Sequence, residues 1–63
     1  MCEFKVFING SQVAEDVIYA KQEGGRVVLR DIIGEPKTFD DVEIIEVNVL
    51  STSLILGHKQ SGG

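Results

Sequence analysis

The 63-residue sequence has few of the side chains that carry most protein chemistry: it contains one cysteine, one tyrosine and one histidine, and no tryptophan. A single cysteine excludes an internal disulfide and fits a reducing compartment. A cysteine nucleophile needs a base held within hydrogen-bond reach, and the single histidine, His58, lies close to the polar end of the chain. We therefore expect a protein that is not an enzyme.

Long apolar runs and runs of positive charge are also missing. No apolar run approaches the roughly 18 residues that a membrane span requires, and no charged leader precedes an apolar stretch. We expect a cytoplasmic protein without a membrane segment. The formal net charge is −4, and six lysines and arginines are scattered among ten carboxylates. This balance repels phosphate backbones, so we do not expect nucleic acid as the partner.

What the sequence does contain is a series of short alternating stretches typical of β-strands. EFKVFI alternates in this way, and Asn9-Gly10 directly after it favours a tight hairpin turn into SQVA. AED then forms a short turn or a single helical turn, and VIYAKQ resumes as a strand. Gly24-Gly25 predicts a second hairpin into RVVLRDI.

The second half of the chain continues the pattern. Pro36 supplies a fixed φ at a third turn, GEP, and KTF follows as a short strand. The acidic pair DD then breaks the pattern before VEIIEVNVL, the longest predicted strand, in which Ile45, Val47 and Val49 share one face while Glu46 faces water. STS turns the chain, LILG pairs back, and HKQSGG forms a polar, flexible tail.

Five to six short strands, with turns at intervals of about 8–12 residues, predict an all-β fold: a small antiparallel β-barrel of the SH3-like or Sm-like kind. We expect one domain over residues 1–57, with at most one short helical turn, followed by the tail at residues 58–63. A chain of this size builds a small core, and such a barrel leaves a strand edge open. Homodimerisation through strand edges or apolar faces is the expected remedy.

Cys2 is the residue whose position suggests chemistry. Thiolate is the metal-ligating form of cysteine, and at the amino terminus nitrogen donors lie beside the sulfur. If Met1 is removed, the Cys2 amine and thiolate chelate a metal; if Met1 stays, its amine and the Cys2 amide join the sulfur. Mixed nitrogen and sulfur coordination suits Ni(II) or Cu(II) better than Zn(II), although Cu or Zn can bind in vitro. One terminus supplies two or three donors, so two termini meeting across a dimer axis would complete a four-donor site.

Each candidate residue also has an alternative. Cys2 is alternatively a small apolar residue that starts the first strand, and His58 is either an exposed tail residue or an additional metal ligand. The alternative to a metal role is a small β-barrel that binds RNA or another protein, with Tyr19, Arg26 and Arg30 as the nucleic-acid-binding residues. A third alternative is a purely structural subunit with an exposed apolar patch and no ligand.

Four stretches give the chain a resemblance to a known family: MCE at the start, EDV, EGGRVVLRDIIGEPK and EIIEVNVLSTSLIL, in this order and spacing. Over residues 1–57 the chain resembles the CooT family of small nickel-binding proteins, some of which accompany carbon monoxide dehydrogenase maturation. The resemblance implies a homodimer of β-rich subunits that binds one nickel ion through Cys2, acting as a metallochaperone or sensor for a client such as carbon monoxide dehydrogenase. Relatives also carry the description "predicted RNA-binding protein", which corresponds to the alternative above.

Overall fold

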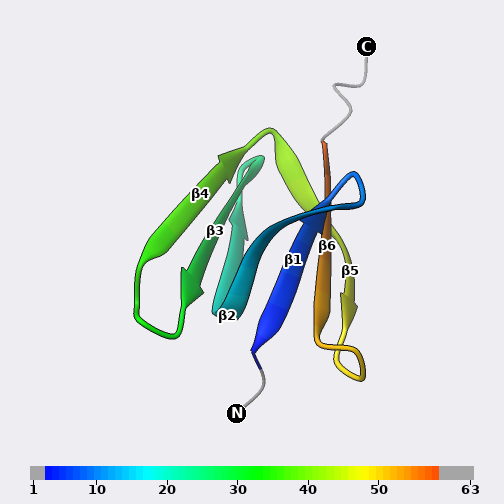
Figure 1. Ribbon diagram of the computed structural model, residues 1–63. Coiled ribbons are helices and arrows are strands. Elements are labelled where there is room, and N and C mark those ends of the chain that lie inside the picture. The colour runs from blue at the N-terminus through cyan, green and yellow to red at the C-terminus, as the bar shows by residue number, and fades with distance from the viewer. Residues whose placement is uncertain (1–2, 59–63) are drawn as a thin grey trace.

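Six β-strands make up most of the computed structural model, which describes residues 3–58 (Figure 1). The strands are β1 (Phe4–Ile8), β2 (Ser11–Glu23), β3 (Arg26–Asp31), β4 (Pro36–Asp40), β5 (Val42–Asn48) and β6 (Ser53–His58). None of the described residues belongs to a helix, so this part of the chain has no helix able to cross a membrane. The prediction of an all-β fold is confirmed.

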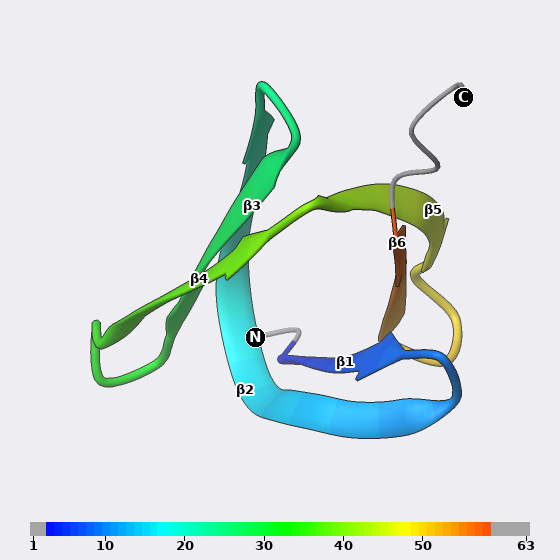
Figure 2. The same cartoon turned by 90° about the horizontal axis from the view of Figure 1, so that it is seen from above.

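The strands form one sheet in the order β4-β3-β2-β1-β6-β5, which curls into the incomplete ring seen in Figure 2. The sheet does not close on itself, so the predicted barrel is approximate. Neighbouring strands are antiparallel except for β1 and β6, which run parallel with Val6 opposite Leu54. The structure differs from the predicted antiparallel barrel at this one pair of the described strands. The parallel pair arises at the link after Asp40. There β5 does not pair with β4 but crosses the open side of the ring. Consecutive strands therefore no longer all run in alternating directions.

The predicted hairpin turns are confirmed, and their backbone angles explain the residues used. Asn9 and Gly10 have φ values of 52° and 80°, and Gly24 and Gly25 have φ values of 54° and 83°. Two successive positive φ angles define the type I′ turn that suits the twist of a two-residue hairpin, and asparagine and glycine adopt them at low cost. These two turns therefore fix the registers of β1 with β2 and of β2 with β3.

The segment AED differs from the prediction because it lies inside β2, which runs for 13 residues and is the longest strand in place of β5. The pairing of β2 with β1 shifts between Ala14 opposite Val6 and Val17 opposite Phe4, which leaves one extra residue in β2. Asp16, with a φ of 56°, lies in this bulge. A bulge bends and twists its strand, so β2 turns a corner here instead of ending in a helical turn (Figure 2).

The core lies inside the curl of the sheet. In the described part of the chain its buried side chains are all aliphatic: Val6, Ala14, Val17, Val27, Leu29, Val42, Leu54 and Leu56. The prediction that Ile45, Val47 and Val49 share a face turned from water is wrong, because all three are more than half exposed. A register shift against β6 between Ile44 and Glu46 breaks the two-residue alternation at this point.

Candidate functional site

Cys2, the predicted metal ligand, lies outside the described residues, as does Met1. The first described strand, β1, begins two residues later at Phe4. Covalent geometry lets two residues span at most about 7 Å, so the surroundings of Phe4 define the region within reach of a metal held by Cys2. The candidate site is therefore the end of the molecule at which β1 begins.

A row of paired residues crosses the sheet at this level. Phe4 pairs with Val17, and Val17 pairs with Asp31; on the other side, Lys5 pairs with Ser53. Asp31 is the last residue of β3 and Ser53 is the first of β6, so the loops adjoining them leave the sheet at the same level. Because neighbouring strands lie about 4.8 Å apart, both loops depart within about 10 Å of the start of β1. Both lie at the lower end of Figure 1, on either side of β1.

The loop between β3 and β4 holds two exposed isoleucines in a fixed conformation. Ile33 is 80% exposed and Ile32 is half exposed. The Asp31 carboxylate accepts hydrogen bonds from the backbone N–H groups of Ile33, at 3.1 Å, and Glu35, at 3.0 Å. The Ile32 N–H donates to the Asp16 carbonyl at 3.0 Å, which ties the loop to the bulge of β2. These bonds present apolar side chains to solvent on an ordered loop.

The turn between β5 and β6 likewise holds exposed apolar side chains in an ordered conformation. Leu50 is 99% exposed, and Val49 beside it is 63% exposed. The Asn48 side-chain oxygen accepts the Ser51 N–H at 3.1 Å, and the Val49 carbonyl accepts the Thr52 N–H at 3.3 Å. An asparagine that bonds the backbone of its own turn limits the conformations available to it. Leu50 is thus an apolar side chain held out from the protein on a structured turn.

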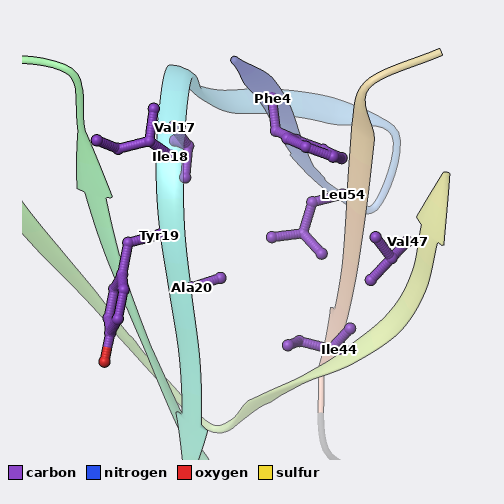
Figure 3. A pocket seen from close by; sticks show the side chains of 8 residues that line it. All are labelled: Phe4, Val17, Ile18, Tyr19, Ala20, Ile44, Val47 and Leu54. Carbon is purple, nitrogen blue, oxygen red and sulfur yellow. The ribbon is translucent and has the colours of Figure 1, made fainter. Parts of the chain in front are cut away.

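An apolar cleft of about 220 Å³ opens between β2 and the β5–β6 pair, and we name it the β2–β5 cleft. Its lining consists of Phe4, Val17, Ile18, Tyr19, Ala20, Ile44, Val47 and Leu54. Figure 3 shows Phe4, Ala20 and Leu54 pointing toward the space between the strands, while Ile18 and Tyr19 project from the other side of β2. The cleft therefore includes the first residue of β1.

Two hydrogen bonds close the other end of this cleft. The Ile44 N–H donates to Oε1 of Gln22 at 2.8 Å, and the Val42 N–H donates to the Gly25 carbonyl at 3.3 Å. Both join the beginning of β5 to the β2–β3 hairpin, across the gap in the sheet. The strands separate from there toward the end at which β1 begins, and the cleft opens in that direction.

His58, the predicted additional ligand, lies at the opposite end of the sheet from Phe4. It is exposed and is the last residue of β6, so that strand extends one residue into the predicted tail. β6 runs parallel to β1 with Leu56 opposite Ile8, and His58 follows two residues later. Six residues of strand separate the level of Phe4 from that of His58, or about 20 Å. One chain does not bring His58 to the region near Phe4.

The residues of the nucleic-acid alternative lie on the outer face of β2 and β3. Tyr19 pairs directly with Arg30, so their side chains project from the same face of the sheet. Arg26 lies further along this face, where its Nε donates to the Asp40 carboxylate at 3.0 Å. An arginine engaged by a carboxylate offers less positive charge to a phosphate. Lys21, on the same face as Tyr19, likewise lies 3.5 Å from the Glu23 carboxylate.

The described residues do not hold a preformed metal centre. Among residues 3–58, no group of three or more histidine, cysteine, aspartate or glutamate side chains is arranged to hold a metal ion. The donor chemistry of the predicted site lies in the thiolate and nitrogens of the amino terminus, and mixed donors of this type fit Ni(II).

Sequence reasoning did not identify the exposed pairs Ile32-Ile33 and Val49-Leu50 as functional residues. A signal was present, because each pair follows directly after an aspartate or asparagine. Asp31 and Asn48 are typical turn residues, whereas consecutive aliphatic residues are not. Aliphatic pairs at turns therefore indicated a contact surface.

Comparisons with known proteins agree with the resemblance. The sequence model of the family described as "CO dehydrogenase accessory protein CooT" matches residues 1–57 of this chain. An uncharacterized protein of Methanocaldococcus jannaschii is 33% identical over 49 residues, which make up 76% of this chain and 86% of that protein.

Proposed function

The chain belongs to the CooT family of CO dehydrogenase accessory proteins, and from this we propose that it is a nickel-binding accessory protein for that enzyme. As an accessory protein it has no catalytic role of its own. It takes up Ni(II) at the amino terminus through Cys2 and passes the ion to CO dehydrogenase as its client. An exposed chain end suits such transfer, because an incompletely enclosed ion can be handed to another ligand set.

The donors explain why we assign the site to two copies of the chain. The Cys2 thiolate and the backbone nitrogen of Cys2 or Met1 supply two or three donors, and Ni(II) favours four in a square-planar arrangement. A twofold axis through the metal places the same donors on both sides. In this proposal the second copy of the chain supplies half of the metal ligands, so the site is complete only in the homodimer.

The observation that carries this proposal is the position of the start of β1. Phe4 lies between the apolar loop that contains Ile33 and the apolar turn that contains Leu50. Exposed apolar side chains on ordered loops are typical of surfaces that bind another protein. Contact through this end would bring two amino termini together. For two Cys2 sulfurs to share an ion, the two Phe4 Cα atoms must lie within roughly 20 Å of one another, given about 7 Å of chain on each side.

A nickel titration tests the proposal. We expect wild-type protein to bind one Ni(II) per two chains, seen by calorimetry, with thiolate-to-nickel charge-transfer absorption that saturates at the same ratio. Cys2→Ser should lose that absorption and bind at least tenfold more weakly. Equal binding by the wild type and Cys2→Ser would contradict the proposal, since the fold away from residue 2 is the same in both.

The pH dependence of binding is a second test. The donors must lose protons, and the free thiol and α-amino groups have pKa values of about 8.5 and 8. Protons therefore compete with nickel, and the affinity should fall as the pH is lowered below 8. Binding that is unchanged between pH 8 and pH 6 would point to carboxylate ligands instead.

Delivery to the client needs its own measurement. Protein loaded with Ni(II), mixed with nickel-free CO dehydrogenase in the presence of a chelator, should restore more enzyme activity than the same amount of free Ni(II). Nickel binding without any transfer would favour the role of a metal sensor.

A further inference from the structure

Thr52, at the end of the β5–β6 turn, has a backbone conformation that its side chain disfavours. Its φ of 50° lies in the left-handed region, which glycine and asparagine enter at low cost and β-branched residues enter only with strain. The Thr52 N–H donates to the Val49 carbonyl at 3.3 Å and so closes the turn. The chain thus has a β-branched residue at a turn position that ordinarily takes glycine.

The hydroxyl of Thr52 holds the residue in this conformation. Its Oγ1 donates to the carbonyl of Ser51 at 2.7 Å, a short bond within the turn. A side chain bonded to the backbone of its own turn limits the conformations open to that turn. Valine has the same shape without this bond, so a valine at this position would have the strain without the bond that offsets it.

The carbonyl of Thr52 accepts the first backbone bond between β1 and β6. The Lys5 N–H donates to it at 2.9 Å, and the parallel pairing of the two strands starts with Lys5 opposite Ser53. On the other side of β1 the ladder is irregular, because the register with β2 shifts between Phe4 and Val6. Among residues 3–58, the bond to Thr52 is therefore the β1–β6 bond nearest to the amino terminus.

We propose that Thr52 is a positioning residue for the metal site at the amino terminus: its carbonyl fixes the start of β1, from which Cys2 reaches the metal. This inference rests on the proposed function, and it assigns Thr52 no contact with the metal. Lys5 follows Cys2 by three residues, at most about 10 Å of chain. A shorter segment between an anchor and a ligand loses less conformational entropy when the ligand closes on an ion. The anchor at Lys5 therefore raises the affinity for the metal.

The left-handed conformation sets the direction of this carbonyl. The sign of φ at Thr52 decides how the Thr52–Ser53 peptide group is rotated relative to the turn, and this group carries the carbonyl. A residue that left the left-handed region would turn the carbonyl away from Lys5 or displace the turn from β6. The affinity for nickel should thus depend on the side chain at position 52.

Two substitutions at position 52 test this dependence. Thr52→Asn introduces a residue that adopts the left-handed conformation readily, and we expect its Ni(II) affinity to lie within twofold of the wild type by calorimetry. Thr52→Val keeps the shape of the side chain but loses the hydroxyl, so its affinity should fall at least fivefold. A valine variant that binds as tightly as the wild type, or an asparagine variant as weak as the valine variant, would contradict the proposal.

Removal of the Lys5 donor alone is a sharper test. Chemical synthesis of the 63-residue chain allows the Lys5 amide to be replaced by an ester, which removes the N–H and changes no side chain. We expect at least tenfold weaker Ni(II) binding and an altered circular dichroism of the nickel d–d bands, which depend on the arrangement of the ligands. The matched control is an ester at Val42, which removes the bond to the Gly25 carbonyl at the opposite end of the sheet. This control should bind within twofold of the wild type with an unchanged spectrum.

A measurement without nickel separates this inference from the proposed function. In EDTA, the ¹⁵N order parameter of the Glu3 amide should fall by at least about 0.1 in the Lys5 ester and stay unchanged in the Val42 ester. A Lys5 ester with wild-type affinity, or with an unchanged order parameter at Glu3, overturns the positioning role alone. Equal binding by the wild type and Cys2→Ser overturns the proposed function and the positioning role with it. If Thr52→Val does not fold, the two esters decide.

Discussion

Oε1 of Gln22 accepts the backbone N–H of Ile44 at 2.8 Å, and this bond joins β2 to β5 across the gap in the sheet. With the bond from Val42 to Gly25 at 3.3 Å, it closes one end of the incomplete barrel. The strands are free to separate toward the other end, where the β2–β5 cleft opens. These two polar contacts thus hold together the end of the molecule opposite to the start of β1.

We expect Gln22→Ala to lower the free energy of unfolding by about 1 kcal/mol, because it removes the partner of a backbone N–H at an edge strand. For a domain of this size, about 1 kcal/mol corresponds to a melting temperature lower by about 4–8 °C. Thermal unfolding followed by circular dichroism measures this shift. Wild type and variant are compared at one protein concentration, since the stability of a dimer depends on concentration.

Gln12→Ala is the matched control for this change. The Gln12 Nε2 donates to the exposed Glu15 carboxylate, at 3.3 Å on the surface of β2. Its loss should change stability by no more than about 0.5 kcal/mol. If Gln12→Ala and Gln22→Ala lowered the melting temperature equally, the closing role of Gln22 would be refuted.

Asp16 provides a prediction about the corner of β2. Its φ of 56° is one that β-branched residues adopt only with strain. We expect Asp16→Val to destabilise the protein by about 1–2 kcal/mol, whereas Asp16→Gly, which tolerates this φ, should stay within about 0.5 kcal/mol of the wild type. Urea denaturation of the two variants measures the difference. A valine variant as stable as the glycine variant would show that the bulge is not needed.

The hairpins could be predicted from the sequence because Asn9-Gly10 and Gly24-Gly25 determine their turns locally. The bulge at Asp16 could not, because EDV has no residue that by itself requires a positive φ. The extra residue in β2 is recognised only from the pairing of β2 with β1 and β3, whose registers shift at this point. The parallel pair of β1 and β6 depends on contacts between the two ends of the chain, which no local pattern encodes.

For the candidate site, the sequence predicts that the Cys2 thiolate is a metal ligand, but it did not predict the apolar surface around the start of β1. Strand periodicity placed Val47 on one face with Ile45 and Val49, whereas the bulge at Ile45 turns Val47 toward the β2–β5 cleft. The sequence placed Leu50 at the end of the predicted strand VEIIEVNVL, whereas β5 ends at Asn48 and Leu50 lies in the turn that follows. The apolar surface becomes recognisable only when the registers bring Asp31, Phe4 and Ser53 to one level.

Gly57 and Ile45 form a pair that a double-mutant cycle can test. A Cβ at Gly57 would lie 2.9 Å from Cδ1 of Ile45, which is closer than real contacts allow. In the wild type, Gly57→Ala should therefore cost about 1 kcal/mol as the isoleucine shifts. In the Ile45→Ala background the same change should stabilise by about 0.5 kcal/mol, because alanine reduces the entropy of the unfolded chain. Identical effects of Gly57→Ala in both backgrounds, by urea denaturation, would disprove the contact.

His58 completes the predictions, because its position bears directly on the metal site. It lies about 20 Å along the sheet from the level of Phe4, at the end opposite to the proposed interface, since β1 and β6 are parallel. In a dimer joined through the end at which β1 begins, the two copies of His58 lie at the far poles. We therefore expect His58→Ala to keep one Ni(II) per two chains, with an affinity within threefold of the wild type by calorimetry. Cys2→Ser, measured in parallel, should lose the site. A tenfold loss of affinity in His58→Ala would place the imidazole on the metal, and would require the two chains to pack with the end of β6 against the start of the partner's β1.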